Sequence, residues 1–179
     1  MTGLNPQTDQ ILQISCFITD SSLDVLDAQG FSSTIHHSQS TLATMSQWCI
    51  ETHSRTGLTS AVMNSSTTPE QASSALLEYI KRYVKTPRTG LLAGNSVHAD
   101  RAFLARKPFS VVLDYLHYRI LDVSSFKEGV RRWGDAGLLR DAPQKKLVHL
   151  ATDDILESID EMRFYRDRLF PAAAAAKQS

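Results

Sequence analysis

A histidine and two aspartates near the end of the chain are the residues whose types and spacing could do metal or proton chemistry. They are His149, Asp153 and Asp154, in a stretch that runs from a loop into an amphipathic helix. Histidine can take up a proton near neutral pH, and hard divalent cations prefer carboxylate ligands. Aspartates also favour the first turn of a helix, where free amides and the helix dipole stabilise negative charge. The spacing alone therefore leaves a reactive site and a helix cap both open.

Asp100 lies at a second place suited to chemistry, the predicted junction of a strand and a helix. A short apolar run, 91–95, ends in Gly94-Asn95 and is followed by polar residues that open a helix carrying Phe103 and Leu104. Polar side chains at such junctions commonly form sites in α/β sheets. A carboxylate that only stabilises the start of the helix remains the alternative interpretation.

The elements that would position these residues are strands and helices of a mixed α/β domain. Helical spacing and a Thr-Pro-Glu-Gln start predict helices, while β-branched and aromatic runs predict strands, the first two of them antiparallel neighbours. We expect strands near 11–18, 91–95 and 117–123, and a second strand or two over 25–27 and 31–35. We expect helices over 42–49, 69–84, 96–104, 124–133 and 155–169, and a loop over 134–146. This order favours α/β with a mixed sheet, in a single domain over 1–170 with a flexible tail over 171–179.

Composition narrows the class of protein. The 179 residues are 42% hydrophobic and 21% charged with zero formal net charge, as in an ordinary globular domain, and no stretch is apolar enough to cross a membrane. No Lys or Arg precedes Arg55, so a long basic groove is not expected, whereas a short anionic ligand remains compatible. Cys16 and Cys49 are expected to be buried, reduced thiols. No secretory signal or transit peptide is visible, so we expect an intracellular protein, cytoplasmic or mitochondrial.

Six segments in order along the chain resemble the oligoribonuclease family, a group of DEDDh 3′-to-5′ exonucleases. The matching segments are 1–4, 47–53, 94–100, 117–124, 131–133 and 149–154. The resemblance implies a ribonuclease H-like mixed sheet flanked by helices and a homodimer. It also implies hydrolysis of short single-stranded RNA, down to dinucleotides, to 5′-mononucleotides. The implied cofactors are two Mg²⁺ or Mn²⁺ ions, which can polarise the phosphodiester and activate water.

The resemblance also implies roles for individual residues. Asp100 and Asp154 would bind metal, His149 would be the general base, and Tyr118 would reach the active site of the neighbouring subunit. The terminal bases would contact Leu4, Trp48 and His53, and the 5′ phosphate would contact Ser96, Arg119 and Ser124. Helical spacing from His149 favours Asp153, but the resemblance selects Asp154. The alternatives are core packing for Leu4, a solvated charge for Arg119, and a core or interface tyrosine without chemistry for Tyr118.

The chain departs from the family at its start. In the family an Asp-x-Glu strand precedes the Met-Thr-Gly-Leu stretch, whereas here Met1 is the first residue, so the first strand is largely missing. We therefore expect an incomplete two-metal site and a nearly inactive chain. A catalytically impaired nucleotide-binding or dimer-pairing fragment of the family is the alternative function, and an Asp-x-Glu strand encoded upstream of Met1 is the alternative explanation.

Overall fold

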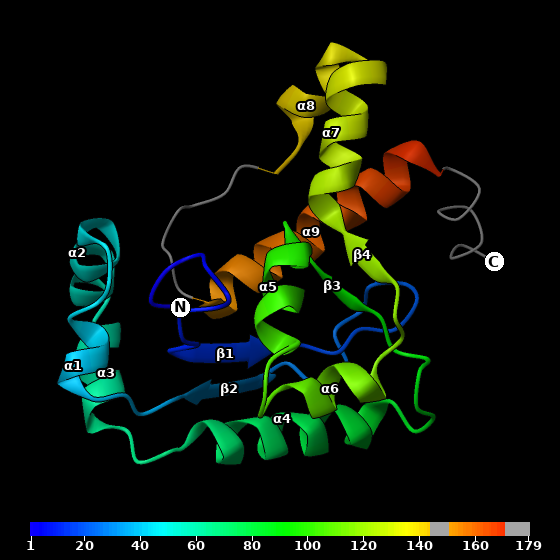
Figure 1. Ribbon diagram of the computed structural model, residues 1–179. Helices are drawn as coiled ribbons and strands as arrows, with labels where there is room; N and C mark the ends of the chain where they lie inside the picture. Colours follow the sequence, from blue (N-terminus) through cyan, green and yellow to red (C-terminus); the bar gives the residue numbers. More distant parts are fainter. Residues whose placement is uncertain (144–150, 171–179) are drawn as a thin grey trace.

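Two short pairs of strands lie at the centre of the molecule, flanked by helices (Figure 1). This computed structural model describes residues 1–143 and 151–170. Strand β1 (Gln13–Cys16) pairs antiparallel with β2 (Phe31–Thr34). Strand β3 (Leu92–Gly94) pairs in parallel with β4 (Ile120–Asp122). The described helices are α1 (Gln39–Leu42), α2 (Gln47–Arg55), α3 (Leu58–Asn64), α4 (Pro69–Tyr83), α5 (Val97–Leu104), α6 (Ser110–Tyr115), α7 (Val123–Trp133), α8 (Ala136–Asp141) and α9 (Ala151–Leu169). The mixed α/β class predicted from the sequence is confirmed, and it is consistent with a ribonuclease H-like exonuclease fold.

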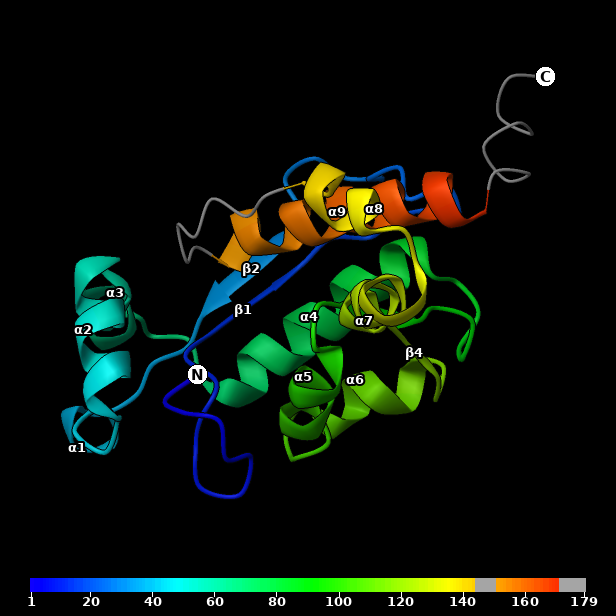
Figure 2. The ribbon, with the colours of Figure 1, turned by 90° about the horizontal axis from the view of Figure 1, so that it is seen from above.

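The β1–β2 pair lies between two long helices (Figure 2). Helix α9 packs on β1 from one side, and α4 packs on β2 from the other. Leu76 and Ile80 of α4 join Val112 and Leu116 in a buried cluster, against which Ile14 of β1 packs. Burial of large aliphatic side chains contributes about 2 kcal/mol each, so this cluster is a major source of stability for the layer.

A second buried cluster fixes α9 against α7. It contains Val123 and Val130 of α7 and Met162 and Tyr165 of α9. Val123 lies directly after β4, so the cluster also sets the distance between α9 and the end of that strand. The position of Asp154 in the fold therefore depends on packing further along the same helix.

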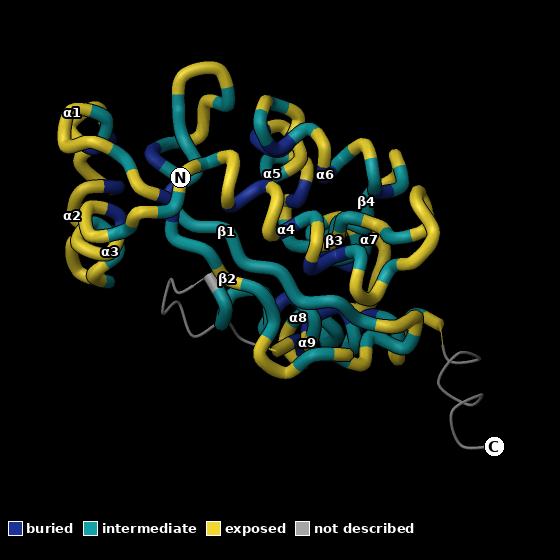
Figure 3. Tube along the Cα trace, turned by 90° about the horizontal axis from the view of Figure 1, so that it is seen from below, coloured by how far each residue is buried: buried dark blue, intermediate teal, exposed yellow. Residues whose placement is uncertain are grey.

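Helices α1, α2 and α3 form a separate group beside the strands, and most of their residues are exposed (Figure 3). Leu12 anchors this group by packing with Leu42, Met45 and Val62, and Cys49 belongs to the same cluster. Both cysteines are free thiols, Cys49 buried and Cys16 partly buried, and burial raises the pKa of the Cys16 thiol to about 12. The prediction of a buried free thiol is confirmed for Cys49, whereas Cys16 is only partly buried.

Three local predictions were wrong. The predicted loop over 134–146 contains α8, which Asp135 caps by accepting a hydrogen bond from the Gly137 N–H. Helix α3, which is absent from the predicted helices, follows Gly57, and Gly57 provides the left-handed backbone that the turn needs. Helix α7 begins at Val123, one residue before the predicted start at 124, and is capped by Asp122, which accepts from the Ser124 N–H.

Candidate functional site

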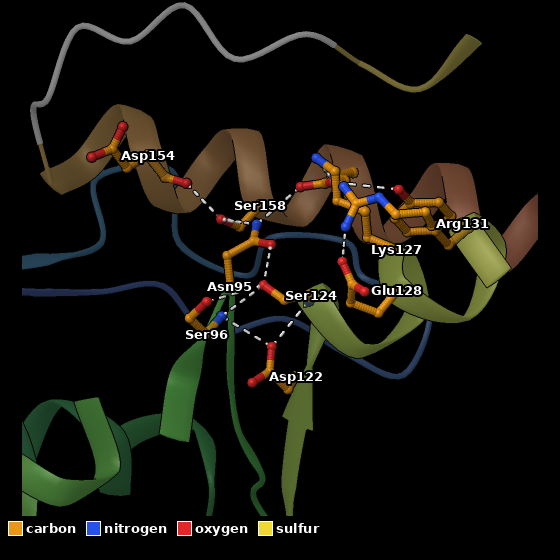
Figure 4. Close-up of polar contacts among 11 residues, drawn as sticks. Asn95, Ser96, Asp122, Ser124, Lys127, Glu128, Arg131, Asp154 and Ser158 are labelled. Atoms are coloured by element: carbon orange, nitrogen blue, oxygen red, sulfur yellow. Dashed lines mark hydrogen bonds and ion pairs between the residues drawn. The ribbon is translucent and has the colours of Figure 1, made fainter. Parts of the chain in front are cut away.

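Polar side chains meet where β3 and β4 end (Figure 4). Because the two strands are parallel, their carboxyl ends lie at the same edge, which is where ligands bind in α/β sheets. The Ser96 N–H donates to Asp122 Oδ1 over 3.0 Å and to Ser124 Oγ over 2.9 Å, and the two serine hydroxyl oxygens are 3.3 Å apart. Ser96 has a left-handed backbone with φ of 51°, a conformation uncommon for serine that these hydrogen bonds help to hold.

Asn95 connects this serine pair to α9. The Ser124 hydroxyl donates to Asn95 Oδ1 over 3.1 Å, and Asn95 Nδ2 donates to Ser158 Oγ over 2.9 Å. The Ser158 hydroxyl in turn donates to the main-chain carbonyl of Asp154 over 2.7 Å. Figure 4 shows Asn95 between the two groups. Two predicted residues, Ser124 and Asp154, are thus joined through two residues that had no assigned role.

Glu161 lies at the inner end of the same network. Its side chain is 2% exposed, and its Oε2 accepts a hydrogen bond of 3.0 Å from Asn95 Nδ2. Lys127 Nζ lies 3.2 Å from Oε1, and the Tyr165 hydroxyl lies 3.4 Å from the same oxygen. Sequence reasoning missed Glu161, although a signal existed. Asp154, Ser158 and Glu161 are spaced four and then three residues apart, the spacing that places polar side chains on one face of a helix.

Asp100 lies in the first turn of α5 and is partly buried. Burial is the largest cause that raises the pKa of its carboxyl group, and the nearby Asp122 carboxylate acts in the same direction. The positive charges of the Met1 amino group and His98 partly oppose this effect. A partly buried carboxylate with a raised pKa is common at functional sites.

The described residues do not complete a metal centre. Asp100 and Asp154 carry the oxygen ligands that Mg²⁺ and Mn²⁺ favour. However, no three His, Cys, Asp or Glu side chains in residues 1–143 and 151–170 gather closely enough to hold an ion. The predicted base, His149, lies outside the described residues. The arrangement of these described residues therefore does not by itself fit a two-ion site.

The turn at the start of the chain presents Leu4 to solvent. Asp9 holds this turn, because its carboxylate accepts from the Thr2 hydroxyl over 2.8 Å and from the Asn5 N–H over 2.9 Å. Leu4 is 88% exposed, so the alternative of core packing is excluded within this chain. Asp9 is thus committed to a structural role that sequence reasoning missed.

Helix α2 carries two further predicted residues, and one of them, His53, contacts the start of the chain. His53 Nε2 lies 3.0 Å from the Met1 carbonyl oxygen, a geometry in which the ring nitrogen donates, and burial is the main cause that lowers the pKa of the ring. Trp48, one and a half turns earlier on the same helix, is 62% exposed. An exposed indole is suited to stacking against a base.

Tyr118 and Arg119 lie before β4, at the opposite end of that strand from Asp122. The Tyr118 ring stacks on His117 with centroids 4.5 Å apart, and the Arg119 guanidinium lies 5.3 Å from the Tyr118 centroid. Tyr118 is 63% exposed and Arg119 is exposed. The structure therefore brings Ser96 and Ser124 together, whereas within residues 1–143 and 151–170 Arg119 contacts Tyr118 and His117, its own neighbours in the chain.

A comparison with protein-family models matches residues 1–162 to the family described as Exonuclease. The matched region includes every residue that was assigned a role from the sequence.

Curated proteins similar to this chain carry the name oligoribonuclease. The mitochondrial oligoribonuclease of Saccharomyces cerevisiae is 44% identical over 173 residues, covering 93% of this chain and 64% of that protein. The mitochondrial oligoribonuclease of Mus musculus is 46% identical over 172 residues, covering 95% of this chain and 70% of that protein. The oligoribonuclease of Neisseria meningitidis serogroup A is 43% identical over 177 residues, covering 99% of this chain and 92% of that protein.

Proposed function

This chain belongs to the oligoribonuclease group of the exonuclease family, and on that premise we propose that its function is 3′-to-5′ exoribonuclease action on short oligoribonucleotides, down to dinucleotides. The observation that carries the proposal is the joining of Ser96 and Ser124, through Asn95, to the helix turn of Asp154. A group that can receive a phosphate is thereby linked to the main chain of the helix turn that carries the proposed metal ligand Asp154. A short substrate is supported because the serine pair lies at one strand edge, with no long basic groove indicated by the composition.

The Ser96 and Ser124 pair would receive the 5′ phosphate, together with Arg119. The Ser96 residue is exposed, and its backbone is held by Asp122, so its hydroxyl is accessible and fixed in place. Arg119 would have to turn from the Tyr118 ring to form the two-pronged contact that guanidinium groups make with phosphates. Binding the phosphate would fix one end of a short substrate and exclude long chains.

Leu4, Trp48 and His53 would hold the terminal bases. Trp48 and Leu4 offer exposed apolar surfaces, and His53 links their two segments through its contact with the Met1 carbonyl. Stacking and wedging contacts do not read base identity, because every base has an aromatic face. We therefore propose little preference for base sequence.

Exonucleases of this family are generally dependent on divalent metal ions, and Mg²⁺ or Mn²⁺ is the proposed cofactor. When bound, such ions supply positive charge to the phosphodiester and to the attacking water. Asp100 and Asp154 are the proposed ligands, and His149 the proposed base. Since the described residues do not complete a two-ion site, binding of a dinucleotide is the part of the function that this chain supports most strongly.

We further propose a homodimer in which Tyr118 reaches the partner's site, in a single domain over residues 1–170. The exposed ring of Tyr118 and the exposed Trp133 provide apolar surface for such an association. No described helix has the length and apolar character to span a membrane. The cytoplasm or the mitochondrion is the proposed location, because the yeast and mouse relatives are named mitochondrial and the others include bacterial proteins.

The test is a pair of measurements on the same chain with a 5′-phosphorylated diribonucleotide. Calorimetric titration measures binding, and chromatography measures release of mononucleotides with Mg²⁺ or Mn²⁺. Binding with release supports the exoribonuclease. Binding without release supports the alternative, a catalytically impaired nucleotide-binding member of the family. Absence of both would overturn the proposed function.

A further inference from the structure

The Asn95 side chain is the point at which the serine pair and α9 are connected, and its orientation decides which groups donate and which accept. Asn95 contacts Ser124 through Oδ1, and Ser158 and Glu161 through Nδ2. An amide presents two donors on one side and only an acceptor on the other. A neighbour that can only accept therefore fixes the direction of the whole network.

Glu161 is that neighbour. An ionised carboxylate only accepts hydrogen bonds, and the Lys127 ammonium group beside Oε1 only donates. The NH₂ side of Asn95 must then face Glu161, and its carbonyl oxygen must face Ser124. A buried carboxylate at 2% exposure is costly unless its partners satisfy it, so this orientation is strongly preferred.

The orientation of Asn95 determines which hydroxyl hydrogen of the Ser96 and Ser124 pair is available to a ligand. The Ser124 hydroxyl has one hydrogen, and it is donated to Asn95. Ser124 Oγ accepts from the Ser96 N–H, which leaves the Ser96 hydroxyl hydrogen as the one in this pair that can turn toward an anion.

We propose, building on the proposed function above, that Glu161 is a positioning residue that directs the Ser96 hydroxyl, and not that of Ser124, to donate to the 5′ phosphate. In the same orientation, Asn95 donates to Ser158 Oγ, so the Ser158 hydroxyl donates its own hydrogen to the Asp154 main-chain carbonyl. Glu161 thus controls both the phosphate contact and the helix turn that carries Asp154.

Replacing the Glu161 carboxylate by an amide should reverse the direction of the hydrogen bond between Asn95 and Ser124. In the Glu161→Gln variant, the introduced amide must face its oxygen to the donor Lys127 and its NH₂ group to Asn95. Asn95 then turns over, its NH₂ group faces Ser124, and the Ser124 hydroxyl hydrogen is released. The side-chain volume is nearly unchanged, so a loss of packing does not explain an effect.

The experiment compares diribonucleotides with and without a 5′ phosphate, titrated without divalent metal so that no hydrolysis occurs. The ratio of the two dissociation constants is the phosphate preference. We expect Ser96→Ala to lower it about tenfold and Ser124→Ala by less than about threefold, since one charge-assisted hydrogen bond corresponds to about tenfold. In the Glu161→Gln background, Ser124→Ala should lower the phosphate preference more than Ser96→Ala does. In every variant, the affinity for the unphosphorylated diribonucleotide should stay constant.

Two controls separate this effect from general loss of structure. Tyr165→Phe removes another hydrogen bond to Glu161 without touching Asn95. Ser73→Ala, in α4, removes a part-buried hydrogen bond to the Pro108 carbonyl. Both should keep the phosphate preference. Equal losses for Ser96→Ala and Ser124→Ala, in both backgrounds, would overturn the inference while leaving the proposed function intact. Failure of the unaltered chain to bind either ligand would overturn the proposed function and the inference together.

Discussion

At the scale of the residue, Trp48 offers the largest exposed ring near the start of the chain. Stacking of one base on an aromatic ring contributes about 1–3 kcal/mol. We expect Trp48→Ala to weaken dinucleotide binding by about tenfold or more, measured by titration. Tyr83→Ala is the control, because Tyr83 is an exposed aromatic residue on another helix, α4, without a proposed role in binding or pairing, and its removal should leave the affinity unchanged. An unaltered affinity for Trp48→Ala would remove the base-stacking role.

Asp100 gives a prediction on pH and stability. Its folded-state pKa is raised above 3.8, mainly by burial, so its carboxyl group favours the folded state when protonated and loses that contribution as the pH rises through the folded pKa. At about pH 7 the ionised carboxylate therefore costs stability, and Asp100→Asn should raise the melting temperature.

The advantage of Asp100→Asn should shrink as the pH approaches the unfolded value of 3.8, which thermal unfolding at several pH values can follow. Asp114→Asn changes an exposed aspartate and serves as the control, with an expected effect within about 0.5 kcal/mol. A destabilised Asp100→Asn variant at neutral pH would contradict the prediction and indicate that the carboxylate has a structural partner.

At the scale of the element, the start of α4 is the clearest agreement between sequence and structure. Thr68 Oγ1 accepts from the Gln71 N–H over 3.2 Å, and Gln71 Oε1 accepts from the Thr68 N–H over 2.9 Å. This reciprocal cap was predicted from four consecutive residues, because all its chemistry is local. Thr68→Ala should cost about 1 kcal/mol in the free energy of unfolding by urea.

The exposed Ser74 lies in the same helix and provides the control for that measurement. Ser74→Ala should be neutral or slightly stabilising, since alanine has the higher helix propensity. Equal losses in both variants would show that side-chain truncation, and not the cap, sets the stability.

The elements that sequence reasoning missed depend on contacts that are distant along the chain. Helix α8 is only six residues long and lacks a full apolar repeat, but Leu138 and Leu139 pack on the cluster of α7 and α9. The Asn95–Glu161 contact joins residues 66 apart, which no local pattern displays. The site residues themselves were obtained through resemblance to a family. The structure brings Ser96 and Ser124 into contact, whereas Arg119 lies with Tyr118, and the roles of all three residues remain predictions. His149 remains a prediction.

At the scale of the whole molecule, the proposed homodimer makes a prediction on mass. Sedimentation equilibrium should give twice the 19.9 kDa of one chain across a dilution series. Tyr118→Phe keeps the ring that stacks on His117 and should remain dimeric, because it removes only the hydroxyl. A single-chain mass for the unaltered protein throughout the series would contradict the dimer.

The position of α9 also fixes the order in which the molecule can be completed during synthesis. This helix, the last in the described chain, packs on β1, one of the first elements to leave the ribosome, and on β3 and α7. A domain with such long-range contacts gains their energy only after the intervening chain has been made. Before α9 has been made, the side of β1 on which α9 packs and the apolar residues Val123 and Val130 of α7 remain uncovered. Protection of nascent chains by chaperones should therefore matter until α9 emerges, and a stalled chain that ends before Ala151 should be the form most prone to aggregate.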